Sequence, residues 1–260
     1  MRWSFSVIRQ YIRVSFASAA AYRADFFLAL VVNLINTFLI PLLTVLIYTN
    51  GAAIPGWSFA EALLIQSVYM FCTGLCAPFM NNIVWVTMEH VREGTYDLLM
   101  LKPGSTVFIT IASSFSLDNI GVLLGGAAMF AFSLKSNPAP SVSGWLQFGF
   151  LFVMGICMYL GCMLLMAAVC FKWIGNSRLP SIYGAVSLFG RYPATIFSAS
   201  LRIVVTYALP VAMLGFFPAS AILGRTSPEM FASAIFCTAF LALGWGVFRR
   251  MIYLYQSAGG

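Results

Sequence analysis

Long apolar stretches, separated by short polar or turn-forming segments, make up nearly the whole chain. A helix of about 20 residues crosses the hydrocarbon of a bilayer, because each residue adds about 1.5 Å. The pattern therefore predicts an all-α, polytopic membrane protein that forms one domain, 1–260. The spans that it places are about 26–48, 61–86, 112–134, 145–171 and 230–248, with one more between 179 and 224.

The third span, 112–134, is interrupted by Asp118 and Asn119. Either one long helix crosses with Asp118 near mid-depth, or the helix begins in water and enters the lipid near Asp118. An acid inside the membrane commonly marks a substrate or ion path. We favour the other interpretation, in which Asp118 is an interfacial or helix-packing acid.

The segment 179–224 allows two placements of the remaining span. By hydropathy alone 203–223 is the better candidate because it carries no charge, although Pro210 and Pro218 interrupt it. A broken apolar segment can instead dip into the membrane and return on the same side, provided that protein shields its backbone. In that case 179–199 is the span, and Arg191 lies within it. Either placement gives six transmembrane helices.

The first 22 residues have the pattern of an amphipathic helix. One face carries basic and polar side chains and another carries large apolar ones: Arg2, Ser6, Arg9 and Arg13 against Phe5, Ile8, Ile12 and Phe16. A basic helix with aromatic residues opposite is typical of a helix that lies in the plane of the membrane interface. We therefore predict an in-plane helix over 1–22, ahead of the first span.

The basic residues predict the orientation. An even number of spans puts both termini on one side, and the positive-inside rule identifies that side as the cytoplasm. If 179–199 is the fifth span, 10 of the 14 basic residues lie on the side of the termini, and the other four are Lys135, Arg191, Arg202 and Arg225. If 203–223 is the fifth span, 12 lie on that side, and the other two are Lys135 and Arg225. The chain is 61% hydrophobic and 8% charged, against about 25% charge in soluble proteins. The basic residues behind the net charge of +7 lie at the ends of apolar stretches, where they set the orientation of the spans. Nucleic acid is therefore not an expected partner.

A polar island, residues 87–104, separates the second and third spans. Its charged residues are Glu89, Arg92, Glu93, Asp97 and Lys102, and it holds the one histidine, His90. We predict a short helix over 87–101, on which Glu89, Arg92 and Glu93 share a face. This helix is either a docking element for a soluble protein or a solvated loop without a partner.

Motifs for catalysis are absent from the sequence. None of the three lysines lies in a phosphate-binding G-x-x-x-x-G-K-[ST] loop, and paired intramembrane carboxylates are lacking. The six cysteines lie in apolar stretches without zinc-site spacing. We therefore expect neither an enzyme nor a bound cofactor or metal in this chain.

Three segments, in this order, resemble the permease subunits of ABC-2-type exporters, in particular the subfamily whose permeases often come as two different subunits beside one ATPase. They are residues 21–26 before the first span, the charged loop 92–103, and the series Tyr192-Pro193, Leu209-Pro210, Phe217-Pro218-Ala219 and Leu223-Gly224. The final stretch from Tyr255 to Gly260 is also similar, so the resemblance covers nearly the whole chain.

The resemblance implies a structure and a mechanism. Residues 1–22 become the connecting helix, 87–101 a coupling helix that inserts into the ATPase, and 200–224 re-entrant helices on the outer side, which favours 179–199 as the fifth span. Glu89, Arg92, Glu93 and Asp97 then transmit force to the membrane helices. The implied substrate path lies along the second and fifth spans, near Phe79, Asn81, Asn82 and Tyr183.

The implied assembly is a bacterial inner-membrane exporter that works by alternating access. Its expected partners are two copies of a cytoplasmic ABC ATPase, which bind ATP and Mg²⁺, a second and related permease chain, and membrane lipid. Two other classes fit the same pattern of spans: a non-transporting membrane scaffold or assembly protein, and an ion-coupled secondary transporter. The substrate does not follow from the sequence.

Overall fold

The computed structural model describes residues 2–173 and 178–255. Residues 1, 174–177 and 256–260, and the side chains of residues 2–5, lie outside the described part. The residues that follow Tyr255 in the C-terminal stretch therefore lie outside the described residues.

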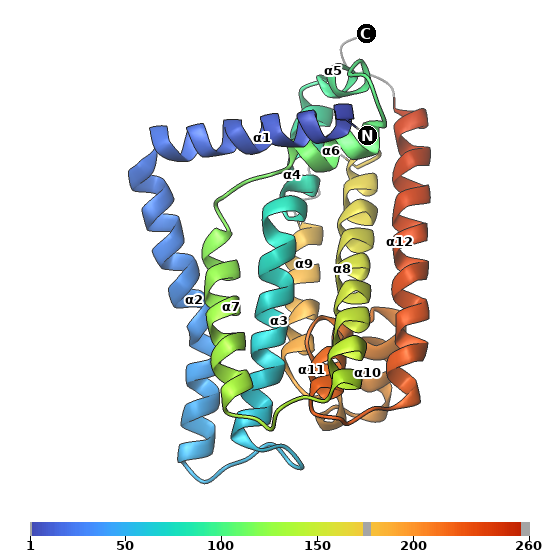
Figure 1. Cartoon of the computed structure of the whole chain (residues 1–260). Coiled ribbons are helices and arrows are strands. Elements are labelled where there is room, and N and C mark those ends of the chain that lie inside the picture. The colour runs from blue at the N-terminus through green and yellow to red at the C-terminus, as the bar shows by residue number, and fades with distance from the viewer. Residues whose placement is uncertain (1, 174–177, 256–260) are drawn as a thin grey trace.

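Every regular element in the described residues is a helix (Figure 1). The longer helices are α1 (Arg2–Ala21), α2 (Arg23–Thr49), α3 (Phe59–Met80), α4 (Asn82–Arg92), α7 (Ile120–Lys135), α8 (Val142–Cys170), α9 (Arg178–Ser187) and α12 (Pro228–Leu254). The short helices are α5 (Tyr96–Met100), α6 (Thr106–Ser113), η1 (Leu188–Arg191), η2 (Ala194–Ile196), α10 (Ala199–Ile203), the π-helical turn η3 (Val204–Ala208), η4 (Val211–Leu214) and α11 (Phe216–Ile222).

Four of these segments are long and apolar enough to cross a membrane: Arg23–Thr49, Phe59–Arg92, Val142–Cys170 and Pro228–Leu254. Shorter apolar helices cover Ile120–Lys135 and Ala199–Ala208. The long helices stand side by side, with α7 packed between α2 and α3, and α8 packed between α3 and α12 (Figure 1). Helix α1 lies across the ends of this row instead of along it.

Glycines allow the helices of the row to approach closely. A Cβ atom on Gly161 of α8 would lie 2.6 Å from the carbonyl carbon of Phe240 on α12. A Cβ atom on Gly126 of α7 would lie 2.6 Å from the carbonyl carbon of Met70 on α3. Small residues at such contacts are the usual means by which membrane helices pack, because lipid supplies no hydrophobic drive between them.

The helical segment that contains the second predicted span, 61–86, extends beyond residue 86. Helix α3 is followed at Asn81 by α4, which carries the helical path to Arg92 and thus into the polar island. The deviation near Asn81 follows Pro78, which has no N–H to donate and whose carbonyl accepts a 2.9 Å bond from the Ser116 N–H. Asn81 keeps helical dihedral angles, so its polar side chain does not stop the helix.

The predicted helix over 112–134 is not continuous. Helix α6 ends at Ser113 and α7 begins at Ile120. Between them the Ser116 hydroxyl donates to Asp118 Oδ2 at 2.6 Å and accepts from the Asp118 N–H at 3.1 Å. Such local side-chain bonds compete with helix formation. The helix therefore starts just after Asp118, which differs from both placements of a helix that runs through Asp118.

Neither 179–199 nor 203–223 forms one helix. Helix α9 and η1 together end at Arg191, and the chain then turns through short helices as far as α11. Pro193 and Pro210 precede η2 and η4, where each removes a backbone donor. The residues of η4 and α11 are buried, at the opposite end of the row from α5 (Figure 1). The two ends are called below the α5 end and the α11 end.

The predicted helix over 87–101 is divided. Helix α4 ends at Arg92 and α5 starts at Tyr96. Gly94 lies between them with φ of +67°. That left-handed conformation suits glycine and ends the helix.

Candidate functional site

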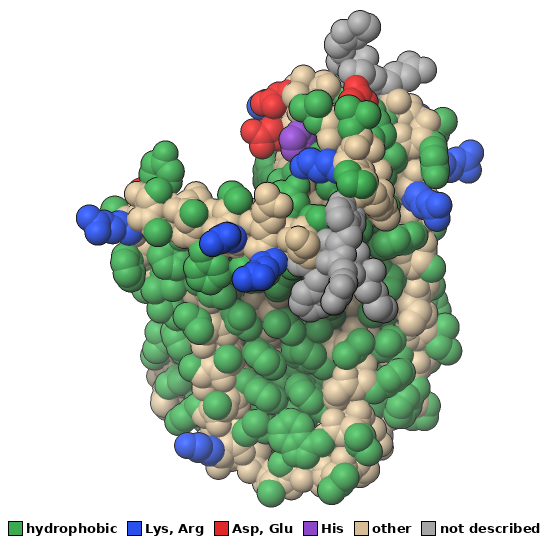
Figure 2. Space-filling model, turned by 45° about the horizontal axis from the view of Figure 1, so that its top comes forward, with side chains coloured by type: hydrophobic (Ala, Val, Ile, Leu, Met, Phe, Trp, Pro, Cys, Tyr) green, Lys and Arg blue, Asp and Glu red, His purple; other side chains and the backbone are tan. Residues whose placement is uncertain are grey.

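The segment from Glu89 to Gly104 forms a protrusion, called here the head, beyond the long helices at the α5 end (Figure 1). Glu89, Arg92 and Glu93 are exposed on it, and Asp97 is half-buried. Figure 2 shows acidic side chains gathered on this protrusion, above sides of the molecule that are mostly hydrophobic. The structure thus brings the four predicted coupling residues together on one projecting surface.

A well-defined turn shapes the head. The Thr95 N–H bonds to the His90 carbonyl at 2.9 Å, and the Gly94 N–H bonds to the Val91 carbonyl at 3.3 Å. This pair of bonds is the Schellman motif, which satisfies the last carbonyls of a helix. His90 Nδ1 and Thr95 Oγ1 lie 2.7 Å apart and add a side-chain bond across the same turn. The orientation of α5 relative to α4 is therefore fixed locally.

Tyr96 anchors the head to the rest of the molecule. Its side chain is fully buried, and its hydroxyl lies 2.9 Å from Thr110 Oγ1 on α6. Its ring packs edge-on against Phe171, after α8, at 4.8 Å between centroids and against Tyr255, after α12, at 5.6 Å. Burial raises the pKa of Tyr96 to about 12, so the phenol is neutral at physiological pH. Tyr96 therefore joins α5 to the ends of α6, α8 and α12.

The outer surface of the head is partly apolar. Leu98 is 60% exposed and Leu101 is 80% exposed, on the same protrusion as the charged residues of α4. Leu99 and Val91 are buried. Charged and apolar groups side by side on a projecting surface suit docking to another protein, because the apolar groups supply contact area and the charges supply specificity.

A second group of predicted residues meets inside the row of helices. The Tyr159 hydroxyl on α8 donates a hydrogen bond to Asn81 Oδ1, between α3 and α4. The Tyr159 ring packs edge-on against that of Tyr183 on α9, with centroids 5.7 Å apart. The Tyr183 hydroxyl is buried and has no hydrogen-bond partner among the described residues. We call Asn81, Tyr159 and Tyr183 the polar strip.

Asn81 and Tyr183 were predicted from the sequence, whereas Tyr159 was not. The available signal was a tyrosine in an uncharged stretch, since a buried phenol usually has a polar partner. Phe79 is not part of the strip: it contacts Phe115, in the connection between α6 and α7, with centroids 5.0 Å apart. Asn82 is half-buried, and no hydrogen bond in the described part of the chain joins it to the strip.

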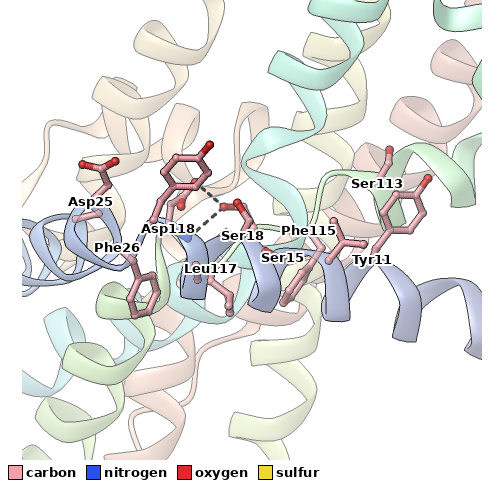
Figure 3. A pocket seen from close by; sticks show the side chains of 14 residues that line it. Tyr11, Ser15, Ser18, Asp25, Phe26, Ser113, Phe115, Leu117 and Asp118 are labelled. Atoms are coloured by element: carbon pink, nitrogen blue, oxygen red, sulfur yellow. Dashed lines mark hydrogen bonds between the residues drawn. The ribbon is translucent and has the colours of Figure 1, made fainter.

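Asp118 lies beside α1, in a cavity of about 560 Å³ (Figure 3). Tyr11, Ser15 and Ser18 of α1 line one side, and Asp25 at the start of α2 lies near one end. Asp118 is exposed, and its carbonyl accepts a 2.7 Å bond from Asn33 Nδ2. Its position at the level of α1 agrees with an interfacial acid better than with an acid at mid-depth.

The α11 end holds an ion-pair network that the sequence did not reveal. Arg225 pairs with Glu61 at 2.5 Å, and its guanidinium lies 4.5 Å from the ring centroid of Trp57. Arg202 pairs with Glu229 at 2.7 Å. These contacts tie the start of α3 to the segment after α11, and α10 to α12, because the paired residues are far apart in sequence.

Arg191, which lies inside the predicted fifth span, packs on Tyr69. Its guanidinium is 4.9 Å from the ring centroid. The Tyr69 hydroxyl donates to Ser187 Oγ at 3.2 Å. The charge of Arg191 is therefore held against an aromatic face of α3, where a cation–π contact stabilises it.

Comparison with known proteins identifies the family. A family model described as ABC-2 family transporter protein matches residues 31–259. Comparisons with curated proteins and with solved structures gave no match. The matched region includes the head, the polar strip and the network at the α11 end. Permeases of this family work with ABC ATPase subunits. The chain therefore belongs to the ABC-2 transporter family, as a membrane-spanning permease.

Proposed function

We propose that the chain is the permease subunit of an ATP-driven ABC exporter that moves its substrate by alternating access. It faces a second permease, a related but different chain, with the substrate path between them. Two separate ATPase subunits bind ATP and Mg²⁺ and carry out hydrolysis, so this chain is not itself an enzyme and binds no cofactor. The observation that carries the proposal is the head, with its exposed charges and its exposed Leu98 and Leu101.

The head is joined to the membrane helices in a way that suits force transmission. Helices α3 and α4 form a nearly continuous run from Phe59 to Arg92 that connects the α11 end with the head. Tyr96 adds the link to α6, α8 and α12. In this mechanism ATP brings the two ATPase subunits together and moves the heads. Glu89, Arg92, Glu93 and Asp97 then transmit the motion without taking part in chemistry.

The substrate path is proposed to pass the polar strip. Asn81 stands where α3 gives way to α4, at a point where motion of the head changes the geometry of the run. The buried Tyr183 hydroxyl has no partner among the described residues and is available to a substrate or to water. Asn82 and Phe79, which flank the strip in sequence, remain predicted members of the path.

Membrane placement follows from the helices and the charges. We propose six crossings, by α2, α3–α4, α7, α8, α9–η1 and α12, with α10 to α11 re-entrant at the outer side. Helices α7 and α9 are shorter than the usual 20 residues or so, and η1 continues the path of α9 as far as Arg191. The head, α1 and the end of α12 face the cytoplasm of a bacterial cell, in its inner membrane.

The test is co-purification of the ATPase from detergent-solubilised native membranes. Wild type is compared with Glu93→Arg and with the control Lys135→Glu, which makes an equally large charge change at the last residue of α7, at the α11 end. We expect the ATPase to be recovered with wild type and with the control, and to be lost with Glu93→Arg.

Each other outcome has a definite meaning. If no ATPase co-purifies with wild type, even at mild salt and with crosslinking, the chain has no ATPase partner and the proposal fails. Transport without an ATPase then identifies a secondary transporter, and a stable complex without transport identifies a scaffold. If Glu93→Arg retains the ATPase as well as wild type does, the docking surface is wrong although the partner is right.

A further inference from the structure

We propose that α1 and the head together bind an anionic phospholipid. The phosphate group lies near Arg9, Arg13 and Lys102, and an acyl chain occupies the cavity between α1 and α6. The lipid comes from the surrounding membrane and is separate from the transported substrate. The proposed lipid site therefore does not depend on the proposed export function, and each can be tested separately.

The first observation is an apolar cavity of about 420 Å³ between α1 and the segment that leads from the head into α6. Its walls are mainly apolar and include Val7, Val14, Pro103 and Ile109. The members with polar atoms are Gln10, Tyr11 and Lys102. Cavities of this size, apolar with a few polar groups, are typical of small-molecule sites. An acyl chain matches the apolar walls, and Lys102 provides the polar contact.

The second observation is a group of cations without acidic partners. Arg9 and Arg13, one helical turn apart and exposed, line an adjoining cavity of about 480 Å³ that shares Gln10 and Val14 with the apolar one. Lys102 Nζ donates to the Tyr11 hydroxyl at 2.7 Å. In the described residues the ion pairs are Arg202–Glu229 and Arg225–Glu61, so none of these three cations is neutralised. Figure 2 shows basic side chains along α1.

The third observation is the level of the site in the molecule. Helix α1 lies across the ends of the long helices (Figure 1), which is the height of the lipid headgroups when those helices cross a membrane. Clustered basic residues at this height attract anionic lipids. Cations and an apolar cavity side by side match both parts of a phospholipid, whereas free phosphate would use only the cations.

The site has a consequence for coupling, because Lys102 belongs to the head and the arginines belong to α1. A lipid held by both would brace the head against α1, in addition to the bond from Lys102 to Tyr11. An anionic lipid is thus expected to raise the thermal stability of the wild-type protein more than a zwitterionic lipid does.

The test measures binding of fluorescent phosphatidylglycerol to the purified protein in mixed micelles. Phosphatidylcholine and soluble glycerol phosphate serve as competitors. The triple variant Arg9→Gln, Arg13→Gln, Lys102→Gln is compared with a control that removes three positive charges at the same end, away from the cavity: Lys172→Gln, Arg249→Gln, Arg250→Gln. We expect the first triple to bind about tenfold more weakly or worse, since each cation contributes to the attraction, and the control to bind nearly as wild type.

A second variant guards against misfolding of the triple variant. Val14→Trp keeps every charge, and Val14 is 61% exposed and lines both cavities, so the fold should tolerate the change. We expect it to weaken phosphatidylglycerol binding without lowering the unfolding temperature in detergent.

Three results would contradict a seated phospholipid. An equal loss of phosphatidylglycerol binding in the two triple variants would indicate general electrostatic attraction. Unchanged binding by Val14→Trp would mean that no acyl chain is seated, and displacement by glycerol phosphate would mean a phosphate site. Any of these results overturns the proposal.

Discussion

Some polar side chains inside the row of helices form hydrogen bonds that join one helix to another. The Tyr159 hydroxyl satisfies Asn81, and the Tyr96 hydroxyl meets Thr110. Gln66 Nε2 donates to Thr44 Oγ1 at 2.7 Å, which joins α3 to α2. The Tyr183 hydroxyl is one of several buried polar atoms, among them those of Thr87 and Ser133, that have no hydrogen-bond partner among the described residues. A buried hydroxyl without a partner lowers stability, so Tyr183 is a suitable position at which to test the proposed substrate path.

The two tyrosines of the polar strip should respond differently to loss of the hydroxyl. Tyr159→Phe leaves Asn81 Oδ1 unpaired and should lower the free energy of unfolding by about 1–3 kcal/mol. Tyr183→Phe removes a hydroxyl that has no partner among the described residues and should leave stability unchanged or slightly higher, while reducing ATP-dependent transport. Thermal unfolding in detergent and transport in proteoliposomes check both. A loss of stability in Tyr183→Phe as large as that in Tyr159→Phe would show that the hydroxyl has a structural partner.

At Tyr96 the ring should matter more than the hydroxyl. Thr110 Oγ1 also donates to the Thr106 carbonyl at 2.9 Å, so Tyr96→Phe should cost only about 1 kcal/mol. Tyr96→Ala removes the aromatic contacts with Phe171 and Tyr255 and should cost about 3–5 kcal/mol. Unfolding temperature and recovery of the ATPase are the measurements. If the two variants are equally impaired, the hydrogen bond anchors the head and the ring packing does not.

At the scale of the helices, close contacts hold the row together and local polar bonds interrupt it. Gly161 and Gly126 bring α8 to α12 and α7 to α3. Ser116 and Asp118 separate α6 from α7, and Gly94 separates α4 from α5. The uncharged helices therefore derive their arrangement from backbone approach, and the bends derive from a few polar or turn-forming residues.

Gly161→Ala should separate α8 from α12. The added Cβ meets the backbone of Phe240 at 2.6 Å, and overpacking of this kind costs about 1–3 kcal/mol. Gly149→Ala on the same helix is the matched control, because nothing lies within 4 Å of a Cβ atom there. The control should be neutral or stabilising, since alanine favours a helix over glycine. The measurement is the thermal unfolding of both variants. Equal changes in their unfolding temperatures would mean that α8 and α12 are not in close contact.

At the scale of the whole molecule, the two ends differ in character. The α5 end carries the head and the unpaired basic residues of α1, whereas the α11 end carries the two ion pairs Arg225–Glu61 and Arg202–Glu229. Among the described residues, more unpaired basic residues lie at the α5 end than at the α11 end, where Lys135 is one, and this difference agrees with an orientation set by the positive-inside rule. It also explains why the net charge of +7 is not spread evenly over the molecule.

Orientation and the number of crossings can be tested with single cysteines in a variant that lacks the native ones. Ser105→Cys and Lys172→Cys should react with a membrane-impermeant maleimide only after cells are permeabilised. Ser136→Cys and Ser200→Cys should react in intact cells. All four residues are exposed. Ser105 and Ser136 flank α7, and Lys172 and Ser200 flank α9 and η1.

The pairs make the outcome specific for each short helix. If Lys172→Cys and Ser200→Cys react from the same side, α9 and η1 do not cross, and six crossings are wrong. If Ser105→Cys and Ser136→Cys react from the same side, α7 does not cross. A full reversal of the pattern would place the head outside the cell and would contradict docking to a cytoplasmic ATPase.

The sequence alone determined the features that depend on composition and periodicity. Long uncharged stretches identify helices such as α2, α8 and α12, since only backbone that satisfies its own hydrogen bonds is stable in lipid. The charged island indicated a projecting segment, and its residues do gather on the head. The resemblance to ABC-2 permeases, visible in the sequence, agrees with the family match.

Only the tertiary structure decided where helices break and which distant residues meet. The ends of α6 and α4 depend on local bonds at Ser116 and Gly94, and hydropathy does not register such bonds. The polar strip, the Tyr96 anchor and the cavity beside Lys102 join residues from separate helices. Contacts of this kind depend on how helices pack against one another, and the periodicity of a single helix identifies only which of its faces are apolar.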